Sequence, residues 1–377
     1  MKLFRILMTG LLATFFSMAG AAPIQVTDAM GREVTLPGPA KRVVLTQARH
    51  FPVLGLLHPD PASVLAGWSD EFKTSFVNEY EAYLKVFPSL ASVPVVGRHT
   101  ADTFSLERAL GLRPDLVVLT ASFAGIGPGQ TARDSLLIQR LEAAGVPVII
   151  IDFFVDPMEN TVPSLLALGD AIGQPERTRE FVDFYRERMA NVARRLADLP
   201  DDERPNVFVH AHAGSTDCCN SPGTGTFNDM ITYAGGHNIG ADIISSSTGR
   251  LNFEYINSRK PAVYVATGTG AGKRASSGGL RIGTGTSPEQ ARESLQGLID
   301  SNRLQALPAV RNGNSHGIWH AFNDSPLHMI FIEALARWIQ PERFADVDPA
   351  RTLEIVNERF LTVPLEGTFL VDLKPAS

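Results

Sequence analysis

Short, almost continuous apolar runs of strand length recur along the chain and alternate with stretches of helical pattern. The runs are Arg42–Thr46, Ser63–Trp68, Asp115–Thr120, Val146–Asp152, Asn206–Ala211 and Ala262–Thr267. Strands buried on both faces of a parallel sheet have this composition, because helices cover both faces. One intervening helix is expected over Leu136–Ala144, where Gly145 ends it. The alternation predicts βαβ units and an α/β fold with mostly parallel sheets.

One unit of this pattern occurs twice, at an offset of 147 residues between positions 105–120 and 252–267. Each copy begins with a polar residue, continues through a short helical stretch and a Pro, and ends in an apolar strand with Thr at its last position. Ser105 and Asn252 suit a helix N-cap, which places Glu107 and Glu254 in the first turn. The repeat predicts two similar lobes arising by duplication; two independent helix–Pro–strand units are the alternative.

A long amphipathic helix is expected between the two halves. It begins at Pro175, which suits the first helical position after Gly173, and extends to Leu199. A single apolar stripe is formed by Phe181, Tyr185, Met189, Val192, Leu196 and Leu199. At 1.5 Å per residue this helix is about 36 Å long, so it acts as a stiff strut. We expect an N-terminal lobe at 22–172, the linking helix at 173–200 and a C-terminal lobe at 201–377, with little opening between the lobes.

The N-terminus has the pattern of a secretory signal peptide. Lys2 and Arg5 precede an uncharged apolar run over Ile6–Met18, and Ala19–Ala21 supplies a small-residue cleavage site. A membrane anchor is the alternative, but the run is shorter than the roughly 20 apolar residues that span a bilayer. We therefore expect residues 1–21 to be removed and the mature protein to lie in a bacterial periplasm, without membrane insertion.

The composition excludes several classes of protein. The 34 Lys and Arg against 40 Asp and Glu give a formal charge of −6, which is unfavourable for nucleic-acid binding. Two cysteines in 377 residues do not form a disulfide scaffold. The 44% of hydrophobic residues is sufficient for a large core.

Several ordered segments of the chain resemble the periplasmic binding proteins of the ABC transporters for iron–siderophore, haem and cobalamin. These segments are Val26–Pro37 with its Asp-x-x-Gly-Arg-x-Val pattern, Pro39–Leu45, the two repeat units, the long helix, Ala234–Asn238 and Leu307–Gly313. The resemblance implies the class III architecture: two α/β lobes on a backbone helix, with a ligand held between them. It also implies a monomer without a cofactor or bond chemistry, which passes its ligand to an inner-membrane ABC permease and its ATPase.

The resemblance also implies a role for two acidic residues. Glu107 and Glu254 match the positions where an acidic residue at the tip of each lobe pairs with arginines of the permease. The alternative role is stabilisation of the two helix N-termini, worth a few tenths to about 1 kcal/mol.

The loops that follow the strands are expected to form the cleft. Their candidate ligand-binding residues are Arg49, His50, Trp68, Arg98, His99, His212, Asp217, Arg274, Arg281, Trp319 and His320. Arg side chains and aromatic faces suit an anionic Fe(III)-siderophore, the favoured ligand. For any single Arg, a solvated surface position is the alternative. The Gly-rich stretch Gly268–Pro288, with Lys273, is expected to be a mobile loop and a candidate lid.

Other ligands remain open at this point. Haem or a corrinoid, with His or Tyr as an axial ligand, is the first alternative. A bare divalent metal, or an extracytoplasmic metal-dependent enzyme, requires that His210, His212, His316 and His320 converge.

Cys218 and Cys219 are the only cysteines and are adjacent. In an oxidising compartment they form either a disulfide with each other or two free thiols. We favour the disulfide, which would stiffen a loop facing the cleft; two buried thiols are the alternative.

Overall fold

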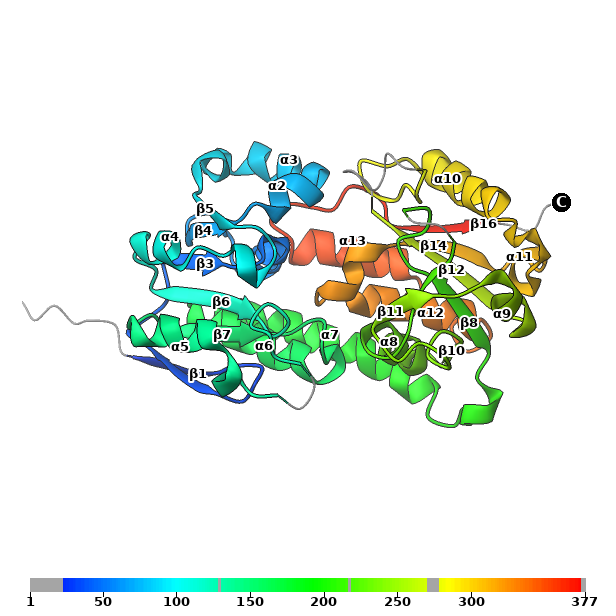
Figure 1. Ribbon diagram of the computed structural model, residues 1–377, viewed down its shortest axis with the longest axis horizontal. Coiled ribbons are helices and arrows are strands. Elements are labelled where there is room, and N and C mark those ends of the chain that lie inside the picture. The colour runs from blue at the N-terminus through cyan, green and yellow to red at the C-terminus, as the bar shows by residue number, and fades with distance from the viewer. Residues whose placement is uncertain (1–22, 128–129, 216–217, 270–277, 374–377) are drawn as a thin grey trace, which may run out of the picture.

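The computed structural model describes residues 23–127, 130–215, 218–269 and 278–373. They form two α/β lobes side by side, with a five-stranded sheet in each (Figure 1). The predicted signal peptide at 1–21, and residues 270–277 of the Gly-rich stretch, lie outside the described residues. None of the described helices is both long and apolar enough to cross a membrane.

The N-terminal lobe contains a wholly parallel sheet in the order β5-β4-β3-β6-β7. Its strands are β3 (Val43–Leu45), β4 (Leu65–Ser69), β5 (Val95–Gly97), β6 (Leu116–Thr120) and β7 (Val148–Ile151). All residues of β3, β6 and β7 are buried, as expected for strands with helices on both faces. The four strands predicted in this half are confirmed to within one or two residues at each end, and β5 was not predicted.

Helices and one hairpin surround this sheet. The elements are β1 (Ile24–Thr27), β2 (Glu33–Leu36), α1 (Phe51–Leu57), α2 (Glu71–Ser75), α3 (Val77–Val86), α4 (Leu106–Gly111), α5 (Leu136–Ala143) and α6 (Pro157–Ala171). Helix α5 ends as predicted, because Gly145 adopts a φ of +76° that side chains with a Cβ disfavour.

The C-terminal lobe contains a sheet in the order β10-β8-β12-β14-β16. Its strands are β8 (Asn206–His210), β10 (His237–Asn238), β12 (Val263–Gly268), β14 (Ser315–Trp319) and β16 (Leu370–Leu373). Only β16 is antiparallel, where it pairs with β14 at the edge. The predicted strands β8 and β12 are confirmed, whereas β14 and β16 were not predicted.

The remaining elements cover this sheet. The helices are α8 (Thr226–Tyr233), α9 (Phe253–Ser258), α10 (Pro288–Ser301), α11 (Pro308–Arg311), α12 (His328–Ile339) and α13 (Pro349–Arg359). Two small antiparallel sheets pair β9 (Asn220–Pro222) with β11 (Thr248–Arg250), and β13 (Gly283–Thr284) with β15 (Gly367–Thr368). The described end of the Gly-rich stretch is therefore partly ordered as β13, rather than a loop throughout.

The two repeat units have the same local structure. Helices α4 and α9, and the first residues of β6 and β12, keep the offset of 147 residues. Ser105 and Asn252 cap the helices as predicted, each accepting a hydrogen bond from a backbone N–H three residues later. The basic residue before each Pro, Arg113 and Lys260, has a left-handed φ of 48° and 46° respectively. The match of caps, helices, turns and strands makes this a structural repeat.

Helix α7 (Pro175–Arg195) links the lobes (Figure 1). It packs against α6 and α1 of the N-terminal lobe and against α12 of the C-terminal lobe. Phe181, Tyr185, Met189 and Val192 are buried, as the stripe predicted. The helix ends at Arg195 and not at Leu199, since Pro200 has no N–H for the carbonyl oxygen of Leu196 and its ring clashes with that carbonyl in a helix. Its 21 residues give about 32 Å, still long enough to reach both lobes.

The C-terminal segment returns to the N-terminal lobe after α13. Thr362 donates its N–H to the carbonyl oxygen of Gly55 in α1, and Arg177 of α7 donates to the carbonyl oxygens of Leu56 and Phe360. One hydrophobic cluster contains buried residues from Val26 to Val371. The lobes therefore share a continuous core, which favours small relative movements.

Candidate functional site

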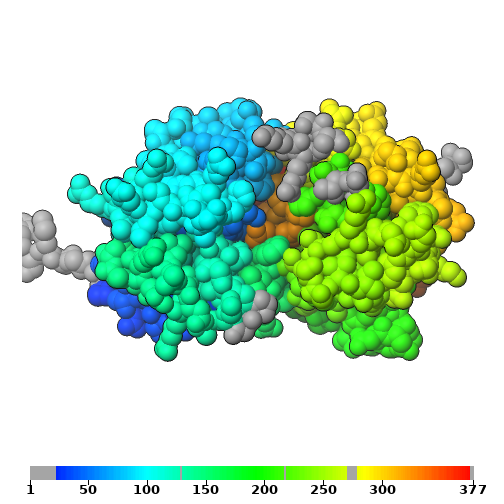
Figure 2. Space-filling model, viewed as in Figure 1, coloured from blue at the N-terminus to red at the C-terminus, as the bar shows by residue number. Residues whose placement is uncertain are grey.

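A cavity of about 800 Å³ lies between the lobes. The space-filling view shows the groove between the blue-to-teal and the yellow-green halves (Figure 2). Its polar and aromatic lining comes from both lobes: Arg49, Asp70, Glu71, Phe72, Glu79, Arg98, His99, Phe154, His212, Trp319, His320, Asn323 and Asp324. Most of these residues follow the carboxyl ends of parallel strands, where crevices of α/β sheets bind ligands. The structure thus places six predicted residues together: Arg49, Arg98, His99, His212, Trp319 and His320.

Arg49 lies in the short 3₁₀ helix η1 (Ala48–His50) after β3 and joins the two lobes. Its Nη1 lies 2.9 Å from Oδ2 of Asp324, in η8 (His320–Asp324) of the other lobe. Its Nη2 lies 2.7 Å from Oε1 of Glu71 in its own lobe. Sequence reasoning missed Glu71 and Asp324, because acidic residues in helical turns are common on surfaces and nothing local indicated their burial.

Burial and charge act on these groups in opposite directions. Burial lowers the pKa of Arg49, but the carboxylates of Asp324 and Glu71 outweigh burial, so the pKa is raised. Burial raises the pKa of Asp324 to about 6, although Arg49 acts to lower it. The pKa of Glu79, on the same cavity wall, is also raised by burial. The cavity therefore contains a carboxyl group, that of Asp324, which takes up a proton in mildly acidic solution.

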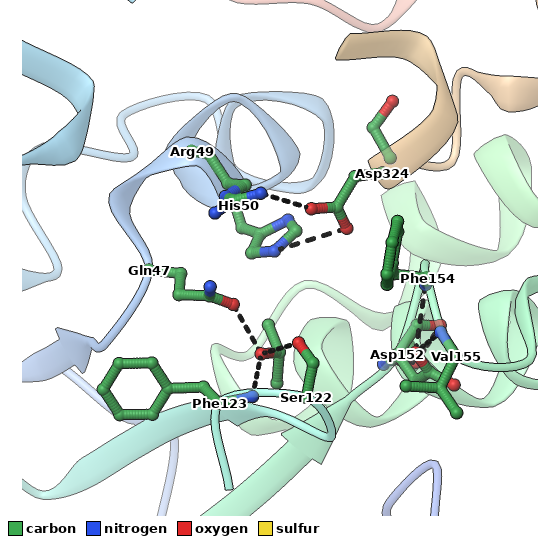
Figure 3. Close-up of polar contacts among 12 residues, drawn as sticks. Gln47, Arg49, His50, Ser122, Phe123, Asp152, Phe154, Val155 and Asp324 are labelled. Carbon is green, nitrogen blue, oxygen red and sulfur yellow. Dashed lines mark hydrogen bonds and ion pairs between the residues drawn. The ribbon is translucent and has the colours of Figure 1, made fainter. Parts of the chain in front are cut away.

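His50 lies behind the cavity wall rather than in it. It is only 2% exposed, and its Nε2 lies 3.8 Å from Oδ1 of Asp324 (Figure 3). Burial lowers the pKa of His50 to about 3, so the ring is neutral and the contact is not an ion pair at neutral pH. Among the residues that the structure describes, neither ring nitrogen has a hydrogen-bond partner. His50 thus packs next to the Arg49–Asp324 pair, on the side of the pair that faces away from the cavity.

Two histidines stack in the wall of the C-terminal lobe. The rings of His212 and His320 lie 3.5 Å apart between centroids. Nδ1 of His320 lies 2.7 Å from the hydroxyl of Thr267, the last Thr of the second repeat unit. Thr120, the equivalent residue of the first unit, contacts Gln47 and Ser122 at 2.5 and 3.2 Å (Figure 3). Each repeat therefore ends in a threonine that orders the loops at the rim of the cleft.

Phe154 reaches the cavity on a loop organised by Asp152. The buried carboxylate of Asp152 accepts backbone N–H groups from Phe154 and Val155, at 3.0 and 2.7 Å (Figure 3). Asp152 ends the strand run recognised in the sequence, but the aromatic residue it positions was not predicted.

Besides His50, two more of the predicted ligand-binding residues lie outside the cavity lining, Trp68 and Arg281. Trp68 is fully buried and packs against Phe51 and Phe72, because its position in β4 faces the core. Arg281 is exposed and does not line the cavity. Asp217, Lys273 and Arg274 lie outside the described residues.

The four histidines of the metal alternative do not converge. Nδ1 and Nε2 of His316 are occupied by Asp372 and Asn314, at 2.7 and 2.5 Å. His212 and His320 line the cavity, whereas His210 is buried in β8. Within the described ranges, the structure brings three side chains of metal-ligating types close together: His210, Cys218 and Cys219.

Cys218 and Cys219 form a disulfide with each other. Neither cysteine is among the described residues that line the cavity, so the expectation that their loop faces the cleft stays a prediction. The loop pairs with the strand around Leu251 through two backbone hydrogen bonds.

Glu107 and Glu254 are exposed in the first turns of α4 and α9, one in each lobe. Neither lines the cavity. Their carboxylates are accessible to a partner that contacts both lobes.

The arrangement of two α/β lobes on a linking helix, with a cavity between them, defines a class of extracytoplasmic binding protein. A family model described as periplasmic binding protein matches residues 57–316, and the chain belongs to this family.

Individual relatives support the same assignment. A crystal structure of the TroA-like periplasmic binding protein FepB from Veillonella parvula is 26% identical, covers 93% of this chain and 100% of that chain, and has a TM-score of 0.83. A cobalamin-binding protein of Halobacterium salinarum is 28% identical over 251 residues, which are 66% of this chain and 59% of that protein. The molybdate-binding protein MolA of Haemophilus influenzae is 23% identical over 291 residues, covering 70% and 74% of the two chains. The match therefore spans about three fifths of the length of the halobacterial relative.

Proposed function

We propose that this protein captures a ferric siderophore or a similar iron chelate between its lobes in the periplasm, and delivers it to an inner-membrane ABC permease with its ATPase. The protein holds the chelate intact and performs no bond chemistry. The observation that carries the proposal is the cavity of about 800 Å³ formed jointly by both lobes. That volume lies within the range of sites that enclose small molecules.

The lining supports a ligand with both anionic and hydrogen-bond-donating groups. Arg98 and His99 are exposed on one wall, where a guanidinium suits the oxygens of an anionic chelate. The carboxyl groups of Glu79 and Asp324, on the same lining, accept hydrogen bonds from donor groups of a ligand.

Aromatic and apolar groups complete the lining. Phe72, Phe76, Phe154 and Trp319 contribute to the wall. Such faces suit the aromatic or aliphatic parts of a chelator, whose polar groups then meet the Arg and carboxyl groups.

A haem or corrinoid ligand is the second candidate. His99, His212 and His320 place imidazoles in the cavity, and an imidazole is a common axial ligand of such metal centres. The halobacterial relative is named as a cobalamin-binding protein. A bare divalent metal is less well supported, because the metal-ligating group found among the described residues lies outside the cavity.

Delivery rests on Glu107 and Glu254. One exposed carboxylate on each lobe gives a permease two contact points, whose separation depends on the opening of the cleft. The helix N-terminal positions also stabilise these carboxylates.

The test is native mass spectrometry of the purified protein with a ferric hydroxamate, a ferric catecholate, haem and cyanocobalamin. We expect a one-to-one complex with an iron chelate, from which the chelate is recovered with unchanged mass. A complex with haem or cyanocobalamin alone supports the second candidate. Conversion of the chelate to products, or no complex with any of the four, contradicts a binding role.

A further inference from the structure

His210, Cys218 and Cys219 form a compact group outside the cavity. One imidazole nitrogen and the two sulfurs all lie within 4.8 Å of one another. His210 ends β8, and the cysteines precede β9, so the group sits where these two strands meet. None of the three residues lines the cavity between the lobes.

The imidazole of His210 is oriented and has one nitrogen available. It is 1% exposed, and its Nδ1 lies 3.3 Å from the hydroxyl of Tyr264. Its Nε2 is buried and has no hydrogen-bond partner within the described part of the chain.

We propose that, when the Cys218–Cys219 disulfide is reduced, these two thiols and His210 form a site for a thiophilic cation such as Zn²⁺. This site is additional to the proposed chelate cavity and does not depend on it. Two thiolates and an imidazole are ligands that zinc and cuprous ions prefer.

Distance and charge both fit this site. Zinc bonds of about 2.3 Å to sulfur and 2.0 Å to nitrogen place neighbouring ligand atoms about 3.6 Å apart. Reduction frees the two sulfurs, which are bonded to each other in the oxidised form, to separate to this distance, and the imidazole nitrogen already lies within 4.8 Å of both. Zn²⁺ with two thiolates is neutral overall, which suits a buried position. Arg250 donates from Nε to the carbonyl oxygen of Cys218 at 3.3 Å, and its positive charge favours the thiolates nearby.

The redox step balances with a dithiol reductant. The reductant supplies two electrons and two protons; the S–S bond of Cys218–Cys219 breaks, and the reductant closes its own disulfide. Zn²⁺ then replaces one proton on each thiol, so two protons leave as two Zn–S bonds form. Oxidation returns the disulfide and removes both thiolate ligands.

The experiment compares the oxidised protein with protein reduced by a phosphine and desalted without oxygen. Native mass spectrometry with Zn²⁺ alone is expected to show one more bound ion in the reduced protein. Cd²⁺ is expected to give a thiolate-to-metal absorption band in the reduced form only. H210N should weaken the added ion at least tenfold, whereas H237N, at a half-exposed histidine elsewhere, should not.

Equal zinc binding by the oxidised and reduced proteins overturns the proposal, as does a reduced protein with two titratable thiols and no added ion. The comparison of the two redox states uses the unmodified chain, so it tests the proposed zinc site even if H210N fails to fold. Zinc bound by the histidines of the cavity would appear in both redox states, which distinguishes it from zinc bound by His210 and the two thiolates.

Discussion

The guanidinium of Arg49 and the carboxylate of Asp324 join the two lobes at the lining of the cavity, with 2.9 Å between Nη1 and Oδ2. They lie 275 residues apart in the chain and belong to different lobes. Together with Glu71, they form the polar floor against which a bound molecule would rest. The same pair therefore influences both stability and ligand binding.

The pKa of Asp324 makes the stability of the protein depend on pH. Because its folded-state pKa is raised to about 6, its proton stabilises the folded form. This contribution is complete below the ordinary carboxyl pKa of about 4 and is lost as pH rises through about 6. Between pH 5 and 7.5 the wild type should lose on the order of 1–2 kcal/mol of unfolding free energy relative to D324N. Urea unfolding of both proteins at the two pH values measures this difference; parallel behaviour would contradict the assignment.

Arg98 is expected to contact the ligand without contributing to the fold. Its side chain is exposed on the cavity wall, so R98A should leave the melting temperature unchanged. Loss of a charge-assisted hydrogen bond of about 1.5–3 kcal/mol should weaken chelate binding about ten- to a hundredfold. Titration followed by fluorescence of Trp319 gives the affinity. R281A removes an exposed arginine outside the cavity and should bind as the wild type does; equal losses in both variants would argue against a specific contact.

Glu107 and Glu254 are expected to act in delivery and not in capture. The double variant E107A/E254A should bind the chelate with wild-type affinity, because neither residue lines the cavity. Uptake of the iron chelate by cells that depend on this protein should fall sharply. The control E187A/E293A removes two exposed carboxylates from α7 and α10 and should support normal uptake. Normal uptake with E107A/E254A would exclude the docking role.

Tyr185 of α7 secures the linking helix to the C-terminal lobe. Its hydroxyl lies 2.6 Å from Nε2 of His328, and both side chains are buried. Y185F leaves that nitrogen without a partner and should lower the unfolding free energy by about 1–3 kcal/mol. Y233F removes a hydroxyl that donates to the carbonyl oxygen of Met189 from a less buried position, and should cost less. Denaturant unfolding of the two variants tests the order, and an equal or reversed effect would contradict it.

The fold was largely predictable because its central strands are buried on both faces. Strands such as β6 and β12 are continuous apolar runs, and the repeat around them fixes their helices and caps. The edge and late strands escaped prediction for a physical reason. Strand β14, Ser315–Trp319, contains His and Gly, and its burial comes from packing against β12 and β16. No local pattern marks such a strand.

The site was only partly predictable, because its residues meet through the tertiary fold. Arg49, Arg98, His212 and His320 were selected because they follow parallel strands, and in the structure they line the cavity; their contact with a ligand stays a prediction. Trp68 was selected by the same rule, but strand pleating directs it into the core. Asp324 could be assigned to the site only from the structure, in which η8 lies opposite η1.

The most direct test of the account measures hydrogen–deuterium exchange with and without the tightest-binding iron chelate. Peptides covering Ala48–His50 in one lobe and His320–Asp324 in the other form opposite walls of the cavity. We predict that the bound chelate slows hydrogen–deuterium exchange in both peptides, and that the chelate is recovered unchanged. Protection confined to one lobe, or located away from the cavity, would contradict the claim that the molecule is held between the lobes.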